Sequence, residues 1–268
     1  MTALPCFYIP HGGGPCFFMD WTLGPADTWE RMAQFLRGML ARVPRAPRAL
    51  VMVSAHWEAD PVAITAGAHP ELIYDYYGFP QHTYALRYPA PGAPELAAQL
   101  AGLLGAAGMP AVLDRTRGFD HGVFIPGLLI RPEADILIVQ LSLHPSLDPD
   151  LHLRLGAALA PLREQGVLLI GSGMSYHNMA VLMRQPQRNP AGDAFDAWLV
   201  DACTAPRGER EHRLADWAAA PGARESHPRE EHLIPLHVIA GAAGAEPGGC
   251  IYRDRVLGAP VAAFAFGG

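Results

Sequence analysis

The sequence lacks long uninterrupted runs of apolar residues. No stretch approaches the roughly 18 residues that a membrane-spanning helix needs, and the N-terminal segment MTALPCFYIPHGGG has no basic region followed by a long apolar one. A secretory signal would show both regions. We therefore expect a cytoplasmic protein without a membrane partner.

Cysteine and positive charge are also scarce. The four cysteines are widely separated and form no C-x-x-C pair, unlike those of a disulfide-rich secreted scaffold, so we expect free thiols. The 20 basic residues are outnumbered by 26 acidic ones, which leaves a net charge of −6. A chain without a broad positive field is not expected to bind nucleic acid or anionic membranes. Small molecules are the expected partners.

Several common catalytic motifs are missing. The GSG at residues 171–173 lacks the third glycine of a dinucleotide-binding fingerprint, and the chain has no P-loop lysine motif. The HGGG at residues 11–14 is similar to the oxyanion-hole run of esterases, but no G-x-S-x-G nucleophile motif accompanies it. His227 and His232 are five residues apart, which fits neither H-E-x-x-H nor H-x-x-E-H. These observations argue against a nucleotide-binding protein, a serine hydrolase and a zincin.

The hydrophobic pattern predicts a single α/β domain over residues 1–268. Half of the residues are hydrophobic and 17% are charged, which is typical of a globular protein with a sizeable core. Short continuous apolar runs indicate strands buried on both faces, and we expect them at residues 6–9, 49–53, 136–139, 167–170 and 261–266. Apolar residues at helical spacing predict helices at 29–43, 94–104, 149–162 and 193–203. We expect a central, largely parallel or mixed sheet flanked by helices, with residues 201–224 as a solvated helical excursion.

Histidines occur where predicted strands end. His11 follows the first strand and His56 follows the second. Because ligands of open α/β sheets bind outside the carboxyl ends of the strands, these side chains are placed to meet there. A metal site would need a third ligand, and the segment SHPREEHLIPLH offers His227, Glu230, Glu231 and His232. The acidic residues have a second interpretation, because they follow a proline suited to a helix start and would complement the helix dipole.

Two further histidines lie in turn-rich segments. His177 follows the strand VLLI through GSGMSY, and His121 lies in RGFDHGVF, where Asp120 is placed to orient it and Gly122 permits close backbone approach. A single histidine is more often a hydrogen-bonded packing residue than a ligand or a catalyst. The argument for function therefore depends on the joint pattern of the histidines.

The sequence resembles the DOPA extradiol dioxygenase family, a branch of the class III extradiol dioxygenases. Six motifs carry the resemblance, in the order HGGGP, SAHWE, YDYYGFP, RGFDHGVF, GSGMSYHN and HPREEHLIPL, and they span about residue 5 to about residue 265. The resemblance implies that His11, His56 and His232 bind the metal and that His177 is the acid–base residue. It further implies that His121 contacts substrate or oxygen and that His227 lines the same cavity. The wider superfamily uses two histidines and a glutamate, which keeps Glu231 as a reserve ligand.

By that resemblance the expected cofactor is Fe(II), with a catechol and O2 as small-molecule partners. Three protein ligands leave open positions on the metal where both reactants can bind. Zn(II) binds such imidazoles at least as well, and two alternatives follow. The first is a zinc-dependent metallohydrolase, and the second is a non-catalytic metal-binding or small-molecule-binding protein with the same fold. The composition permits a homo-oligomer.

The segment YDYYGFP is a candidate substrate wall. Tyr77 and Phe79 belong to an aromatic cluster that would suit a planar ring, although such a cluster beside a Gly-Pro turn often packs in a core. Arg117, Arg87 and His82 are candidates to receive a substrate carboxylate. DOPA, a simpler catechol, a caffeate-like acid and a gallate-like ring all fit the implied chemistry.

Overall fold

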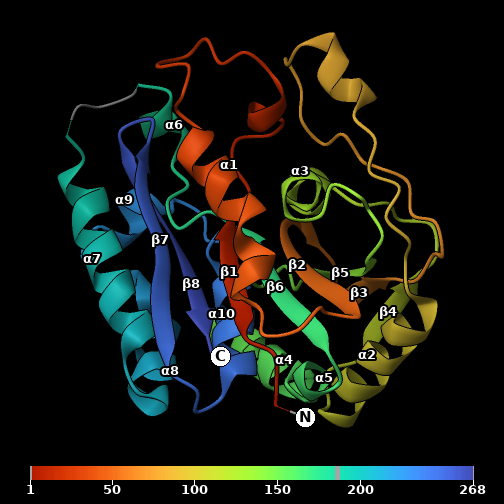
Figure 1. The fold of residues 1–268 in the computed structure, drawn as a ribbon. Helices are drawn as coiled ribbons and strands as arrows, with labels where there is room; N and C mark the ends of the chain where they lie inside the picture. Colours follow the sequence, from red (N-terminus) through yellow and green to blue (C-terminus); the bar gives the residue numbers. More distant parts are fainter. Residues whose placement is uncertain (1, 185–187, 268) are drawn as a thin grey trace.

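The structure is a computed structural model that describes residues 2–184 and 188–267, and a mixed sheet runs through its centre. The sheet has eight strands in the order β4-β3-β5-β2-β6-β1-β8-β7 (Figure 1). The central strands β5, β2, β6 and β1 are parallel, whereas β8 pairs antiparallel with both β1 and β7. The bounds are β1 Cys6–Pro10, β2 Ala49–Glu58, β3 Val62–Thr65, β4 Ala111–Asp114, β5 Leu137–Leu143, β6 Val167–Gly173, β7 Gly248–Val256 and β8 Ala259–Phe266.

Both faces of the sheet are buried, and this explains the continuous apolar runs. Successive side chains of a strand point to opposite faces. In β1, Cys6 and Tyr8 belong to one hydrophobic core, while Phe7 and Ile9 belong to a second. The predicted α/β class with a mixed sheet between helices is confirmed, and the five predicted strands are present.

Helices form a layer on each side of the sheet. The core that contains Phe7 is covered by α1 (Glu30–Arg37) and α3 (His121–Ile130), and the opposite core takes side chains from α2, α4, α7, α8 and α10. Figure 1 shows α7 and α8 beside β7, and α2 beside β4 at the other edge. The remaining bounds are α2 Pro94–Ala106, α4 Pro149–Leu159, α5 Pro161–Glu164, α6 Met179–Leu182, α7 Pro190–Thr204, α8 Arg207–Ala215, α9 Ala223–Ser226 and α10 Ile234–Ala243, with 3-10 turns at Cys16–Phe18, Met39–Arg42, Gln81–Ala85 and Trp217–Ala219.

Two predicted helices are interrupted. The helix expected at 29–43 ends at Arg37 and resumes as a 3-10 turn after Gly38, because glycine weakens a helix. The helix expected at 149–162 is divided before Pro161, which has no N–H to continue the hydrogen-bond ladder. No helix among the described residues is long and apolar enough to cross a membrane.

Helices α3 and α10 are absent from the sequence prediction because nearly all of their residues are buried. A helix that is apolar on all sides shows no amphipathic period. Helix α10 begins at Ile234, with Pro235 in its first turn, so the helix start expected at Pro228 is wrong.

The segment 201–224 is packed more tightly than its charge suggests. Arg210 and Trp217 are almost wholly buried, and the Arg210 guanidinium donates to the backbone carbonyls of Gly244 and Glu246. An arginine buries its apolar stem readily when its terminal guanidinium nitrogens find acceptors, as both do here. The prediction of a solvated excursion is therefore wrong for this part of the segment.

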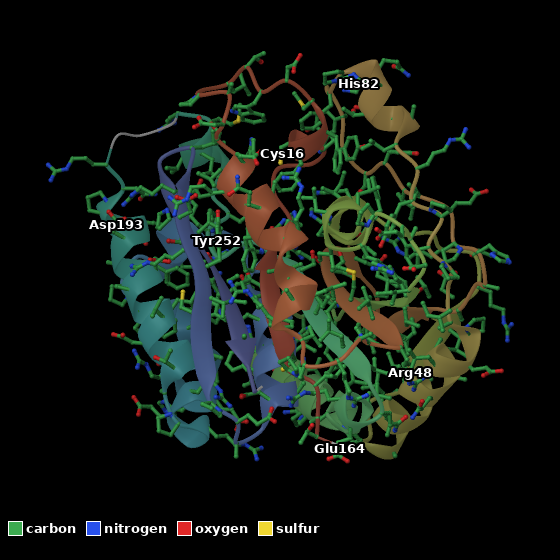
Figure 2. The ribbon with its side chains drawn as sticks, viewed as in Figure 1. Cys16, Arg48, His82, Glu164, Asp193 and Tyr252 are labelled. Atoms are coloured by element: carbon green, nitrogen blue, oxygen red, sulfur yellow. The ribbon has the colours of Figure 1, made fainter. Side chains whose placement is uncertain are left out.

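The cysteines are free thiols, as predicted. Cys16 is buried beneath the loop that follows β1, where its sulfur accepts the backbone N–H of Gly13 at 3.3 Å (Figure 2). Burial raises the pKa of the Cys16 thiol, so it is held protonated and packs as a small apolar residue.

Candidate metal centre and active site

Three histidines meet at the carboxyl edge of the sheet. His11 follows β1, and its backbone N–H donates to the carbonyl of Gly173 at the end of β6. His56 lies near the end of β2, within an irregularity between Val53 and Glu58 in the pairing with β5. His232 precedes α10, and its carbonyl accepts the Tyr8 hydroxyl at 2.7 Å. The sheet thus brings together residues that are up to 221 positions apart (232 minus 11).

The ring nitrogens of these histidines converge. His11 Nε2 lies 3.2 Å from His56 Nε2, and the ring centroid of His232 lies 5.2 Å and 4.9 Å from those of His11 and His56. One nitrogen of each ring lies within 4.8 Å of the other two. Two nitrogens bound to one ion at about 2.1 Å and a tetrahedral angle would lie about 3.4 Å apart. The spacing is therefore that of metal ligands.

Hydrogen bonds set the tautomers so that ligand lone pairs face inward. Nδ1 of His11 lies 2.9 Å from the Gly12 carbonyl, and Nδ1 of His232 lies 2.8 Å from Glu231 Oε1. Both partners are acceptors, so each Nδ1 carries the proton and each Nε2 keeps its lone pair. Nε2 of His232 is buried and has no partner among the described residues. A metal ion would satisfy it, since histidine ligands ordinarily donate their other ring nitrogen to a carbonyl or carboxylate.

Electrostatics also favours a cation at this point. Burial lowers the pKa of His11, His56 and His232 well below the usual range of histidine, and the neighbouring imidazoles lower it further. The three side chains are thus neutral at physiological pH. Metal ions bind the neutral form of imidazole, so the residues present fit a mononuclear metal.

Asp75 orients a fourth histidine. Its Oδ1 lies 2.9 Å from Nδ1 of His121, the first residue of α3, and its Oδ2 lies 3.8 Å from Nδ1 of His56. Burial acts to raise the pKa of Asp75, but the hydrogen bonds from His121 outweigh it and hold that pKa below its usual value. The sequence prediction missed this residue, although Asp75 is the one acid in the aromatic segment YDYYGFP.

The orientation expected from Asp120 is wrong. Its carboxylate instead accepts the Ser54 hydroxyl at 2.7 Å and the Gln140 amide. Gly122 plays the role predicted for it: a Cβ there would lie 2.4 Å from Ser54 Oγ and 3.1 Å from His56 Cδ2. Only glycine lets the start of α3 approach β2 this closely.

Glu231 links a fifth histidine to the group. Its Oε1 lies 3.2 Å from Nδ1 of His177 as well as 2.8 Å from Nδ1 of His232. The rings of His177 and His232 are stacked, with centroids 3.4 Å apart. Burial acts to raise the pKa of Glu231, but the hydrogen bond with His177 and the nearby Arg229 outweigh it and lower that pKa. Glu231, His177 and His232 form a second set of side chains with metal-ligand spacing.

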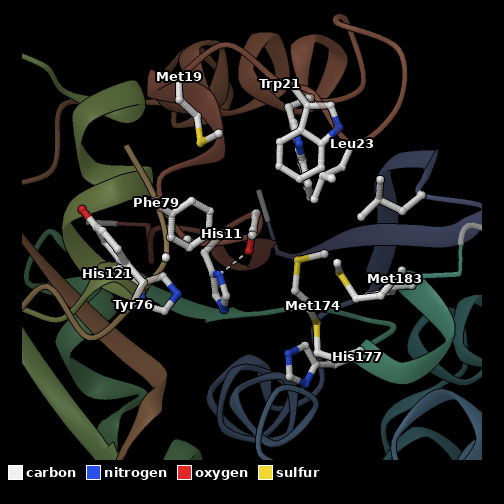
Figure 3. A pocket seen from close by; sticks show the side chains of 18 of the residues that line it. His11, Met19, Trp21, Leu23, Tyr76, Phe79, His121, Met174, His177 and Met183 are labelled. Atoms are coloured by element: carbon white, nitrogen blue, oxygen red, sulfur yellow. Dashed lines mark hydrogen bonds between the residues drawn. The ribbon is translucent and has the colours of Figure 1, made fainter. Parts of the chain in front are cut away.

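All five histidines line one cavity of about 830 Å³. Figure 3 shows His11 near the middle of the view and His177 below it, with Met19 and Trp21 at the top. Tyr76 and Phe79 also line the cavity, so the aromatic segment 74–79 supplies part of its wall. Aromatic and methionine side chains therefore make up much of the rest of the wall.

Two predicted substrate contacts lie elsewhere. Tyr77 is 91% exposed and is not among the residues that line the cavity. His227 is fully buried between Phe195 and Trp217, where its Nε2 donates to the Ser175 carbonyl at 3.0 Å. Phe79 does line the cavity, as expected.

The candidate carboxylate receivers are also outside the cavity. Arg117 lies over the Trp57 ring and pairs with Asp120, and His82 contacts the Phe18 carbonyl at 3.0 Å (Figure 2). Arg87 is not a lining residue either.

Comparison with known proteins agrees with this arrangement. Residues 5–264 match the family described as the catalytic LigB subunit of aromatic ring-opening dioxygenase. The chain belongs to the LigB family. LigB family dioxygenases are metal-dependent, and this chain carries a histidine group that fits a metal.

Relatives of this LigB protein extend over most of its length, and the resemblance to the DOPA extradiol dioxygenases is confirmed. It is 42% identical to the 4,5-DOPA dioxygenase extradiol of Beta vulgaris, over 89% of this chain and 86% of that protein. It is 38% identical to the dioxygenase tasH of Hapsidospora irregularis, over 100% of this chain and 87% of that protein. A crystal structure of an uncharacterized Escherichia coli protein superposes with a TM-score of 0.76 at 29% identity, covering 98% of this chain and 100% of that one.

Proposed function

We propose that the protein is an extradiol dioxygenase that opens a catechol ring at a mononuclear Fe(II) site held by His11, His56 and His232. The observation that carries the proposal is the convergence of three neutral imidazoles, one with an unpartnered buried Nε2, beside the acid–base candidate His177. In this reaction the ring bond next to the diol breaks, and both atoms of O2 enter the product.

Fe(II) bound at the three histidines would supply a common site for the catechol oxygens and O2 and would let electron density pass between them. The protein contributes the rest. The cavity beside the histidines holds the aromatic ring, and its apolar walls keep bulk water from the reacting atoms.

His177 is the proposed general base and acid. Its Nδ1 faces the carboxylate of Glu231, which only accepts, so that nitrogen carries a proton and Nε2 is available to the cavity. Nε2 is then able to take a proton from a catechol hydroxyl and return it when the O–O bond breaks. Glu231 stabilises the cationic imidazole while it holds that proton.

His121 is the proposed second active-site histidine. Asp75 binds its Nδ1, which directs the other ring nitrogen away from that carboxylate, and the ring lines the cavity. The His121 ring centroid lies 3.9 Å from that of His56. A histidine at this point would hydrogen-bond to substrate or O2 next to the ligands.

Glu231 acts in this proposal as an orienting partner and not as the reserve ligand. The same Oε1 receives the Nδ1 protons of His177 and His232, and Oε2 faces Arg229 at 3.5 Å. A carboxylate bound in this way fixes the tautomer and raises the basicity of a ligand histidine.

The identity of the metal is tested by loading the metal-free protein with Fe(II) or with Zn(II). Three imidazoles suit Zn(II) as well as Fe(II), and Zn(II) has no redox cycle. We would prepare the metal-free protein, load it anaerobically with either metal, add catechol, 4-methylcatechol, DOPA and protocatechuate, and admit air. The proposal predicts a yellow ring-opened product and one O2 consumed per catechol with Fe(II) alone.

Substitution of the base provides the internal control. We expect His177→Gln to keep Fe(II) and lose most turnover, by roughly 100-fold or more, while the exposed control His212→Gln keeps both. Stoichiometric Fe(II) binding without O2 uptake on any catechol would contradict the proposal and favour a zinc hydrolase or a binding protein.

A further inference from the structure

The cavity has a polar floor and an apolar upper part. The five histidines group at one end, and in Figure 3 Met19, Trp21 and Leu23 lie across the cavity from His11 and His177. In the same view Met174 and Met183 lie between His177 and the group of Trp21 and Leu23. Because the diol of a catechol must face the floor, a ring substituent extends into the apolar part.

The volume of about 830 Å³ exceeds what a single ring needs. Sites of about 300–1,000 Å³ accommodate drug-sized ligands. Met179 and Met183 line the cavity and are 49% and 55% exposed, so they present apolar surface that a substituent would cover. Methionine walls adapt to apolar groups of various shapes.

Positive charge is missing from this part of the wall. The chain has no lysine, so its 20 permanent side-chain cations are arginines, and no arginine is among the described lining residues. Asp20 is the one carboxylate among them, and it is exposed. The indole Nε1 groups of Trp21 and Trp29 are buried without partners among the described residues, but they are neutral donors.

A carboxylate substituent would therefore lose water here without gaining a counter-charge, and only the exposed Asp20 could pair with an ammonium. Burying an unpaired carboxylate or ammonium is far more costly than burying an alkyl group, and a neutral indole donor offsets less of that cost than a guanidinium would. A carboxylate would in addition be repelled by Asp20.

We propose that this pocket selects catechols with an uncharged apolar substituent, such as an alkyl chain or a second aromatic ring, over catechols with an amino-acid or carboxylate group. The inference rests on the proposed dioxygenase function and names its substrate class. The proposed substrate class differs from DOPA, the substrate that the names of the DOPA dioxygenase relatives indicate for those proteins.

The first test compares kcat/KM of the Fe(II) enzyme on catechol, 4-butylcatechol, 3,4-dihydroxybiphenyl, L-DOPA, dopamine and protocatechuate. Each buried methylene is worth roughly four-fold in affinity, so we expect 4-butylcatechol to exceed catechol by about 50-fold or more and L-DOPA to fall below catechol. Equal or better kcat/KM on L-DOPA or protocatechuate would overturn the inference. A preference for dopamine over 4-butylcatechol would overturn it too, since it would show that Asp20 pairs with a cationic substituent.

The second test uses the metal-free protein and does not depend on turnover. Trp21 and Trp29 line the cavity, so their fluorescence should report binding. We expect 4-butylphenol to bind at least about 10-fold more tightly than tyrosine or 4-hydroxybenzoate, consistent with the methylene estimate. If this order holds while no catechol is turned over, the dioxygenase proposal fails and the apolar specificity stands. Tighter binding of the charged compounds overturns the specificity alone.

Adding a positive charge to the cavity wall tests the inference with a matched control. Met179→Arg places a guanidinium on the cavity wall, whereas Val112→Arg places one at an equally exposed position, 49%, on β4 outside the cavity. We expect Met179→Arg to shift the kcat/KM ratio of protocatechuate to 4-butylcatechol upward on the order of 10-fold and Val112→Arg to leave it unchanged. An unaltered ratio in Met179→Arg would contradict the inference.

Discussion

The imidazole rings of His177 and His232 are stacked nearly parallel, with an interplanar angle of 18° and centroids 3.4 Å apart. Their Nδ1 atoms both face Oε1 of Glu231, at 3.2 Å and 2.8 Å. One carboxylate therefore sets the tautomer of the proposed base and of a proposed metal ligand. The two rings present their Nε2 atoms to the same cavity.

Glu231→Gln tests this link. The variant loses the charge that fixes both rings, and loss of such an outer partner typically weakens metal binding 10- to 100-fold. We expect this weaker metal binding to appear in a chelator competition, together with a lower kcat. Its neighbour Glu230 pairs with Arg224 at 2.6 Å instead, so Glu230→Gln is the matched control. Indistinguishable metal affinities for the two variants would show that Glu231 does not orient the ligand.

Asp75→Asn separates orientation from metal binding. The amide oxygen still accepts the Nδ1 proton of His121, but a neutral acceptor is weaker than a carboxylate by about 1 kcal/mol. We therefore expect kcat to fall by roughly 5- to 10-fold, with a shifted pH profile and nearly full metal occupancy. Asp135→Asn, which alters an exposed pair with Arg131, should change neither. Loss of metal with unchanged kcat per bound ion would assign Asp75 to the metal site instead.

Removal of a ligand histidine should abolish stabilisation by metal. A site that binds only the folded chain raises the free energy of unfolding by about 2.7 kcal/mol at a metal concentration of 100 times Kd. We expect Zn(II) to stabilise the metal-free protein by this amount in urea unfolding, and to give little stabilisation in His11→Ala or His232→Ala. The exposed His212→Ala should behave like the parent. Full stabilisation of His11→Ala by metal would place the ion elsewhere.

His227 should make the metal-free protein sensitive to acid. Burial lowers its pKa from about 6.5 to about 3, against a smaller opposing effect of the hydrogen bond to Ser175. Because the unfolded chain binds the proton more readily, the stability contributed by neutral His227 is present above pH 6.5 and is lost as pH falls towards 3. Between pH 7 and pH 5 this amounts to about 2 kcal/mol.

The measurement is urea unfolding of the metal-free parent and His227→Gln at pH 7 and pH 5. We expect the stability of the parent relative to the variant to decrease by about 2 kcal/mol at the lower pH. Other buried histidines contribute equally to both proteins and cancel in the comparison. The exposed His212→Gln should show no such change relative to the parent. A pH-independent difference would mean that His227 is not held neutral.

Much of the architecture is predictable from local patterns. A strand buried on both faces must be apolar throughout, so the runs at residues 6–9 and 167–170 predict β1 and β6. The position of His11 after β1 follows from the same reasoning. Helix α3 escaped prediction because burial on every side removes the amphipathic period.

The sequence by itself determined the α/β class, the strand-end histidines and, through resemblance, the histidine set that converges in one cavity. Only the tertiary structure decided which side chains lie next to each histidine. Asp75 and not the adjacent Asp120 orients His121, and His227, five residues from His232, faces a buried aromatic pair instead of the cavity. Side chains in irregular segments have no fixed period, so long-range packing alone sets where they point.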